Sequence, residues 1–300
     1  MKTPHLFEPL PPGGRLGLAW PASPAGEEEL RTGLDIVREL GYVIDWQTVR
    51  EGPLAYLAGS DRERAEELTR LMVHEPVAGV LAARGGYGCL RMAGLLDFDR
   101  LAAAGKPLVG FSDVTVLLSG LLSAGLCSIH GPSLSSLAEQ SSGYLERWSS
   151  LLSGGWESSE PLVGRPVLGK GRVRGFLVGG NLTVLAHLVG TPWQPPLAGG
   201  LLFLEDIGEK LYRLDRALTH LLTAGLLERV RAVALGRFQG ADYEAVLEMV
   251  RDRLAPLDLP VMAGLPFGHG PDNASLVVGG EAEMDLESGL LRPLPATDES

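Results

Sequence analysis

The chain has 300 residues, of which 45% are hydrophobic and 21% are charged, and its formal net charge at pH 7 is -11. This composition predicts a soluble globular protein, and the length suits two domains. It argues against a membrane protein, because no window approaches about 18 uninterrupted apolar residues, and against a nucleic-acid partner, because the arginines are scattered rather than gathered into a basic face.

The amino terminus and the potential metal ligands narrow the class of protein further. The first residues contain neither a continuous apolar core nor a small-residue cleavage site, so we expect a cytoplasmic protein. Cys89 and Cys127 lie among apolar residues without metal-ligand spacing, which favours a role as small buried hydrophobes. The six histidines are dispersed. We therefore predict no metal site and no cofactor.

Strands and helices alternate from Arg15 to His130. Residues 60–63 form a capping-box signature at the start of one predicted helix. The alternation predicts a parallel, doubly wound sheet. Its strands are expected at residues 15–19, 42–46, 78–82, 107–109 and 127–130, and its helices at residues 27–40, 60–72, 90–96 and 114–124.

The composition changes between residues 141 and 170, where serine and glycine are frequent around one short predicted helix at 144–152. We interpret this stretch as a linker between a domain of residues 1–140 and a second domain of residues 171–300. In the second domain, strands are expected at 172–178, 201–204, 230–235, 275–279 and 283–286, a turn at 179–181, and helices at 182–189, 211–222 and 242–254.

Ligands of doubly wound sheets bind beyond the carboxyl ends of the strands. Residues 21–24, 84–88 and 111–113 are the loops in that position. The glycine-rich loop 84–88 is too short, and too poor in lysine, to be a phosphate-binding loop. Two interpretations of it stay open: a tight turn that needs positive φ, or a backbone that approaches a substrate with no side chain in the way.

Ser112 follows a short apolar strand and precedes an apolar helix, so it lies at the tip of a strand–turn–helix unit. The order resembles a nucleophile elbow, although the sequence is G-x-S-D rather than G-x-S-x-G. Unpaired NH groups in the first turn of the helix could receive an oxyanion. The alternative is that Ser112 is an ordinary helix N-cap.

A serine nucleophile needs a base and an acid that orients the base. His269, between glycines and prolines, is the best-placed base, and His130, at a strand end, is the second candidate. Glu205 and Asp206 end a predicted strand and are candidates for the acid, although such a pair is often only a solvated edge. The remaining histidines lie in a tail, at a helix end or within helices: His5, His74, His187 and His220.

Seven sequence segments occur in this order between about Arg15 and Leu286: ARGGYG, GFSDVT, IHGP, GGNLTVL, GTPW, FLEDIGE with YRLDR, and GLPFGHG. Together, and in this order, they resemble the motifs of the LD-carboxypeptidases, the muramoyltetrapeptide carboxypeptidases of peptidoglycan recycling. One departure is Trp193, where tyrosine is more usual, and it affects the expected pocket surface rather than the chemistry.

The resemblance implies a serine peptidase with a triad of Ser112, Glu205 and His269. It also implies an oxyanion hole formed by backbone NH groups at Asp113 and, in the glycine loop, at Gly86. The implied architecture is α/β: a flavodoxin-like, parallel-sheet amino-terminal domain and a smaller β-rich carboxyl-terminal domain, with the site between them. The implied partners are a muropeptide tetrapeptide, from which the terminal D-alanine is removed, and a second copy of the chain in a homodimer.

Two other functions are open at this point. A sister group of the same family cleaves microcin C-type peptidyl-nucleotides and keeps the triad, while the arginine-led glycine loop favours the carboxypeptidase branch. A non-catalytic ligand-binding protein with two α/β domains around a cleft is the second alternative. Arg84 has two interpretations, as the arginine that binds the substrate's terminal carboxylate or as a structural arginine that pins the loop.

Overall fold

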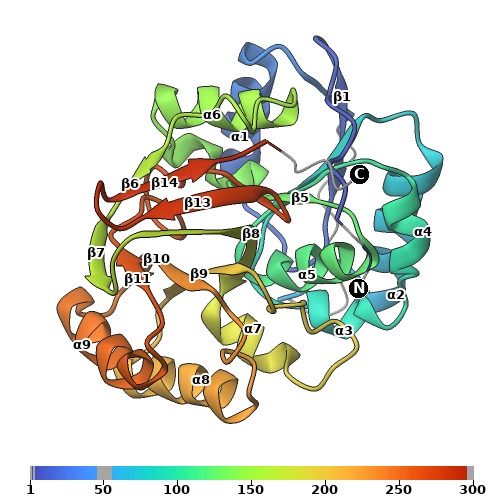
Figure 1. Ribbon diagram of the computed structural model, residues 1–300. Coiled ribbons are helices and arrows are strands. Elements are labelled where there is room, and N and C mark those ends of the chain that lie inside the picture. Colours follow the sequence, from blue (N-terminus) through green and yellow to red (C-terminus); the bar gives the residue numbers. More distant parts are fainter. Residues whose placement is uncertain (1, 3, 46–55, 296–300) are drawn as a thin grey trace.

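The computed structural model describes residues 2, 4–45 and 56–295. Within these residues the strands form one sheet of six strands and one of eight (Figure 1). The fold is mixed α/β, as predicted. Trp46, the last residue of the predicted second strand, lies outside the described residues.

The first sheet has the order β2-β1-β3-β4-β5-β12, and all of its neighbours are parallel except β12, which runs antiparallel to β5. The order of its first five strands is that of flavodoxin-like folds, which confirms the predicted class. The apolar side chains of β1, β3, β4 and β5 are almost completely buried, whereas Val43 on the edge strand β2 is 48% exposed. The strands are β1 (Arg15–Ala19), β2 (Val43–Asp45), β3 (Gly79–Ala82), β4 (Leu108–Gly110), β5 (Ser128–His130) and β12 (Leu276–Val278).

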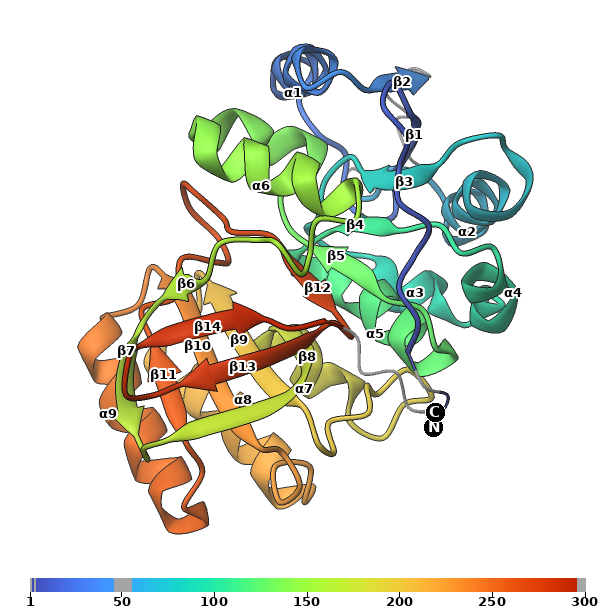
Figure 2. The same ribbon diagram turned by 45° about the horizontal axis from the view of Figure 1, so that its top comes forward.

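Helices cover both faces of this sheet, with α1 and α6 on one side and α2 to α5 on the other (Figure 2). The capping box at Ser60 opens α2, and a π-helical turn, Arg70–His74, follows it. Almost every residue of α5 is buried, because this helix also packs against β8 and α7 of the second half. The helices are α1 (Glu27–Glu39), α2 (Asp61–Thr69), α3 (Cys89–Ala93), α4 (Phe98–Ala103), α5 (Thr115–Ala124) and α6 (Ser142–Leu152), with 3₁₀ turns at Ser112–Val114 and Leu134–Glu139.

The second sheet has the order β6-β14-β13-β8-β9-β10-β11-β7, with a parallel centre from β8 to β11. Only Gly164 separates β6 from β7, which stand at opposite ends of that order, so the sheet curls into a barrel-like shape. Its strands are β6 (Leu162–Val163), β7 (Arg165–Leu168), β8 (Arg172–Asn181), β9 (Leu201–Ile207), β10 (Ala232–Gln239), β11 (Val261–Ala263), β13 (Glu281–Asp285) and β14 (Leu290–Pro293); its helices are α7 (Leu182–Leu188), α8 (Leu211–Thr223) and α9 (Tyr243–Leu254), followed by a 3₁₀ turn at Ala255–Leu257.

Two segments contain strands that the sequence-based expectation lacks. Residues 141–170, predicted as a linker with one short helix, contain that helix as α6, which buries Trp148, and also both edge strands of the second sheet. Residues 179–181, predicted as a turn, are the end of β8. Gly179 permits this because a Cβ atom at that position would collide with the carbonyl oxygen of Phe203 on β9.

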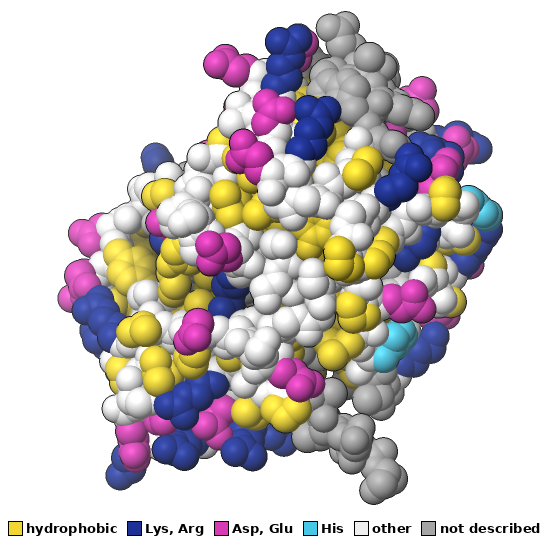
Figure 3. Space-filling view, turned by 90° about the horizontal axis from the view of Figure 1, so that it is seen from above, with side chains coloured by type: hydrophobic (Ala, Val, Ile, Leu, Met, Phe, Trp, Pro, Cys, Tyr) yellow, Lys and Arg dark blue, Asp and Glu magenta, His cyan; other side chains and the backbone are white. Residues whose placement is uncertain are grey.

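The surface and the buried groups agree with several expectations from composition. Acidic and basic side chains are interspersed over the face shown in Figure 3. Cys89 and Cys127 are free and buried, as predicted. Across residues 2, 4–45 and 56–295, no helix is both long enough and apolar enough to cross a membrane.

Candidate active site

Ser112 stands at the sharp turn between β4 and α5. Its φ is 61°, a left-handed backbone conformation that residues other than glycine rarely adopt. Gly110 makes the turn possible, because a Cβ atom there would lie 2.9 Å from Val114 Cγ1 and 3.1 Å from Ala82 Cβ. A strained residue at the tip of a strand–turn–helix unit is the backbone geometry of a nucleophile elbow.

The Ser112 side chain is partly exposed, and its hydroxyl makes no hydrogen bond within the described part of the chain. The glycine loop lies directly against it. A Cβ atom on Gly85 would lie 2.9 Å from Ser112 Cβ and 3.2 Å from Ser112 Oγ. Only glycine allows this approach, so the loop places its backbone beside the hydroxyl, as the second interpretation of the loop requires.

Ser23 holds the rest of the glycine loop in position. Gly86 has a φ of 104°, and a Cβ atom on it would collide with the Ser23 hydroxyl. That hydroxyl accepts a hydrogen bond from the Tyr87 NH at 3.2 Å and donates one to the Tyr56 carbonyl at 2.9 Å. The Ser23 NH in turn donates to the Gly85 carbonyl at 3.2 Å. The two predicted ligand loops, 21–24 and 84–88, therefore form one unit.

Asp113 follows Ser112 and is buried. Its carboxylate accepts a 2.8 Å hydrogen bond from the Cys89 NH, which ties the start of α3 to the turn. Burial raises the pKa of Asp113, and the bond from Cys89 opposes that rise. The Asp113 side chain is thus structural, which leaves its backbone as the part available to a substrate.

Arg64, on α2, is a structural residue of the site that we did not single out from the sequence. Its guanidinium is buried and donates to the carbonyls of Pro21, Gly59 at 3.3 Å and Gly88 at 3.0 Å. The side chain thereby links both ligand loops to α2. Its sequence context, DRERAEELT, is that of an exposed polar helix, so only the tertiary contacts distinguish it from its neighbours.

Glu205 and His269 form a short ion pair or hydrogen bond. The Nδ1 atom of His269 lies 2.6 Å from Glu205 Oε2, and the same oxygen accepts a hydrogen bond from the His269 NH at 3.1 Å. Gly268 allows this loop to fold over the carboxylate, because a Cβ atom on it would lie 2.6 Å from Glu205 Cβ. Glu205 is completely buried, whereas the His269 side chain is 13% exposed.

The pair shifts the pKa of each partner toward its charged form. Burial alone would raise the pKa of Glu205, but the attraction and hydrogen bond of His269 outweigh it and lower that pKa. Burial alone would lower the pKa of His269, but Glu205 outweighs it and raises that pKa above the ordinary value. These shifts are the kind expected of a histidine base and the acid that orients it.

Asp206, the other member of the acidic pair, has a different task. Its carboxylate accepts hydrogen bonds from the Asn181 side-chain amide at 3.1 Å, the Thr183 NH at 2.9 Å, the Thr183 hydroxyl at 2.7 Å and the Ile207 NH at 2.8 Å. It therefore anchors the start of α7 to β9. Burial raises the pKa of Asp206 against those bonds.

His130, the second candidate base, is packed among aromatic rings instead. Its ring lies 5.1 Å from that of Phe203 and 6.1 Å from that of Phe111, and neither ring nitrogen has a hydrogen-bond partner among the described residues. Complete burial lowers its pKa to about 4. His130 is therefore neutral near pH 7 and is not paired with a carboxylate.

Arg84 lies at the surface and bonds to neighbouring groups of the protein there. Its guanidinium lies 3.8 Å from Glu29 Oε2 and 3.4 Å from the Pro24 carbonyl oxygen, which it bonds, and nearly half of its side chain is exposed. These contacts fit the structural interpretation, in which Arg84 pins the loop through backbone and ion-pair bonds.

The candidate triad residues come from both halves of the molecule. Ser112 follows β4 of the first sheet, Glu205 lies on β9 of the second sheet, and His269 lies on the loop after β11. Phe111, the residue before Ser112, brings the two parts together, since its ring centroid is 4.7 Å from that of His269. The site is thus at the junction of the two sheets.

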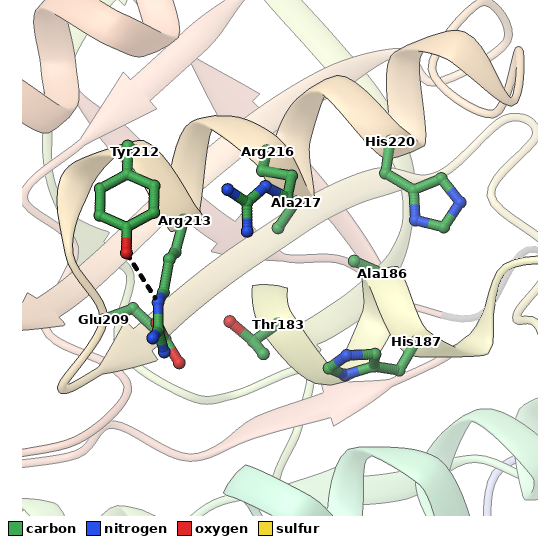
Figure 4. A pocket seen from close by; sticks show the side chains of 9 residues that line it. All are labelled: Thr183, Ala186, His187, Glu209, Tyr212, Arg213, Arg216, Ala217 and His220. Carbon is green, nitrogen blue, oxygen red and sulfur yellow. Dashed lines mark hydrogen bonds and ion pairs between the residues drawn. The ribbon is translucent and has the colours of Figure 1, made fainter.

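Two hollows lie near these elements. One, of about 450 Å³, is lined by His269, by the end of β10 and by the residues that follow β11. The other, of about 560 Å³, lies between α7 and α8 and contains none of the predicted site residues; its lining side chains are Thr183, Ala186, His187, Glu209, Tyr212, Arg213, Arg216, Ala217 and His220 (Figure 4). In the described ranges, no group of three or more histidine, cysteine, aspartate or glutamate residues could hold a metal ion.

Comparison with known proteins agrees with this architecture. Residues 16–131 match the model of the LD-carboxypeptidase N-terminal domain, and residues 174–284 match that of the LD-carboxypeptidase C-terminal domain. The chain is 37% identical to the murein tetrapeptide carboxypeptidase of Pseudomonas aeruginosa, over 92% of this chain and 94% of that protein. It is 24% identical to the microcin C7 self-immunity protein of Escherichia coli, over 95% and 94%.

Among solved structures, the chain is similar to muramoyltetrapeptide carboxypeptidase from Oxalobacter formigenes. The TM-score is 0.81 at 32% sequence identity, and the match covers 94% of this chain and all of that one. Two domain models in the expected order, a whole-length relative above 30% identity and a shared fold lead to one conclusion. The chain belongs to the LD-carboxypeptidase family of peptidases.

Proposed function

We propose that this protein is a serine LD-carboxypeptidase that removes the terminal D-alanine from peptidoglycan-derived tetrapeptides. The observation that carries the proposal is the 2.6 Å pairing of His269 Nδ1 with the buried carboxylate of Glu205. Two further observations support it: Ser112 is held at a φ of 61°, and the ring of its neighbour Phe111 lies 4.7 Å from that of His269. In this proposal Ser112 is the nucleophile, His269 the general base and Glu205 the orienting acid.

The proposed mechanism gives each group a proton position that the 2.6 Å contact between His269 Nδ1 and Glu205 supports. Glu205 accepts the hydrogen of Nδ1, so the Nε2 lone pair of His269 is left to receive the Ser112 proton. Ser112 Oγ attacks the carbonyl carbon of the penultimate residue. The oxyanion is held by backbone NH groups at Asp113 and in the glycine loop, where Gly86 is the proposed donor.

Breakdown of that intermediate completes the first half of the reaction. His269 passes its proton to the amine of the terminal D-residue, the peptide bond breaks, and an acyl-enzyme on Ser112 is left. Water then gives a proton to His269 and attacks the ester carbonyl. The bond to Ser112 Oγ breaks, His269 returns the proton to that oxygen, and the shortened peptide leaves with a free carboxylate. The name of the P. aeruginosa relative supports a murein tetrapeptide as the substrate.

Hydrolysis of a peptidyl-nucleotide is the second candidate function. The observation in its favour is the similarity to the microcin C7 self-immunity protein along nearly the whole chain. The murein tetrapeptide carboxypeptidase is the more similar of the two relatives, at 37% against 24% identity, and this favours the muropeptide. A homodimer stays a prediction, to be checked by sedimentation of the purified protein.

The test is incubation with L-Ala-γ-D-Glu-X-D-Ala peptides of varied residue X, with released D-alanine measured by mass spectrometry. A peptidyl-adenylate analogue is offered in parallel. We expect D-alanine from the wild type, and a fall in kcat of roughly 10³- to 10⁶-fold in Ser112→Ala. Cleavage of the adenylate alone would assign the second function, and cleavage of neither substrate would favour a non-catalytic binding protein.

A further inference from the structure

A carboxypeptidase must recognise a free terminal carboxylate, and the overall field of a chain with a net charge of -11 repels anions. Recognition therefore has to be local. Arg84 is tied to Glu29 and to the Pro24 carbonyl, and it does not line the hollow beside His269. The cationic side chain that does line this hollow is that of Arg237.

An irregularity in β10 accompanies the position of Arg237 in the wall of the hollow that His269 also lines. The pairing of β10 with β9 shifts register between Leu235 and Phe238, so Gly236 and Arg237 lie outside the regular ladder. Irregularities of this kind re-aim side chains and are frequent beside active sites. The Arg237 NH donates to the Phe267 carbonyl at 2.9 Å, which fixes this backbone to the loop that carries His269.

The Arg237 side chain then passes close to the catalytic loop. A Cβ atom on Gly270, the residue after His269, would lie 3.6 Å from Arg237 Cδ. The guanidinium gives one hydrogen bond, to the Asp272 carbonyl at 3.1 Å, and forms no ion pair within residues 2, 4–45 and 56–295. The Asp272 carboxylate is occupied by the Ser141 NH at 2.7 Å. Most of the donors of Arg237 thus remain available to a ligand.

We propose that Arg237 binds the terminal carboxylate of the peptide and so makes the enzyme an exopeptidase. This inference rests on the proposed function. In that reaction His269 protonates the leaving nitrogen, and the carboxylate belongs to the carbon bonded to that nitrogen. A group that binds this carboxylate must therefore share a cavity with His269, as Arg237 does. A guanidinium can hold the carboxylate through two parallel hydrogen bonds.

The test uses matched substrates, one ending in D-alanine and one in D-alaninamide, and compares the ratio of their kcat/KM values. The wild type should prefer the free acid. Arg237→Gln should lower this preference by roughly 10- to 100-fold, the size of a lost hydrogen bond to a charged group. Arg237→Lys keeps the charge without the fork and should give an intermediate ratio.

Arg231→Gln is the matched control. Arg231 precedes the other end of β10 and likewise donates to a backbone carbonyl, that of Arg174 at 2.8 Å, so its replacement should leave the ratio unchanged. If Arg237→Gln lowered kcat/KM equally for both substrates, their ratio would stay the same, and Arg237 would be a merely structural arginine. A ratio that stays the same with no loss of kcat/KM would likewise overturn the assignment. If the wild type released no D-alanine at all, the proposed function itself would fall, and the role of Arg237 with it.

Discussion

Glu205 and Asp206 show how two adjacent carboxylates acquire different tasks. Side chains alternate between the faces of a strand, so one residue of the pair meets the His269 loop and the other meets the start of α7. The sequence predicts an acidic pair at a strand end and, through the family resemblance, favours Glu205. The residues alone do not predict which carboxylate meets the histidine, because this depends on which loop covers which face.

The pH dependence of the proposed reaction follows from the pKa of His269. Glu205 raises that pKa above the ordinary value of 6.5. His269 must be neutral to accept the Ser112 proton, so activity is lost as the pH falls through the raised pKa. We expect the acid limb of the kcat/KM profile to lie above pH 6.5, and a limb near pH 4, where His130 titrates, would point to the wrong base.

Glu205→Gln should lower kcat strongly, by about 10⁴-fold, because an amide can support the wrong tautomer of His269. The remaining activity should have an acid limb at lower pH, since the charge that raises the pKa of His269 is gone. Asp206→Asn is the comparison. It disturbs the anchor of α7, so it should lower the melting temperature, and it should lower kcat much less than Glu205→Gln does. A greater loss of kcat in Asp206→Asn would reverse the two assignments.

At the scale of elements, most helices and strands follow from periodicity, capping and glycine positions, while their connections do not. The capping box at Ser60 predicts the start of α2 correctly. Two glycines before Asn181 predict a turn, whereas in the structure they lie at the end of β8, where Gly179 lets β8 and β9 approach closely. Glycine is typical both of turns and of close contacts between strands, and only the neighbouring strand in the folded protein distinguishes the two.

Arg64 provides a test of how α2 supports the glycine loop. Arg64→Met would leave three backbone carbonyls without their buried donor, and we expect a loss of about 2–4 kcal/mol in the free energy of unfolding, measured with urea. Arg62→Met, on the same helix with its side chain 80% exposed, should change it by less than about 0.5 kcal/mol. Similar values for the two variants would refute the structural role of Arg64.

At the scale of the whole molecule, the chain crosses between its halves more often than the predicted two-domain scheme suggests. The flavodoxin-like order of the first sheet agrees with the alternation of strands and helices. The strand β12 was expected at residues 275–279 but within the second domain, and it pairs instead with β5 of the first sheet. Local patterns predict that a segment is a strand, whereas its partner depends on contacts distant in sequence.

This crossing predicts how the protein unfolds. Between His269 and β12 the chain passes from one sheet to the other, and α5 is buried against both halves. We therefore expect one cooperative transition in calorimetry, with enzymatic activity lost at the same temperature. Two separate transitions would show that the halves unfold independently.

The left-handed backbone of Ser112 sets stability against the proposed activity at a single residue. Any residue with a Cβ atom is strained in this conformation, with or without a hydroxyl. Ser112→Ala therefore keeps the strain, while Ser112→Gly removes it. Glycine should make the protein more stable than alanine at this position, by about 1 kcal/mol. A laboratory selection for thermostability alone would thus be drawn toward an inactive enzyme, and only a simultaneous demand for turnover would keep the serine.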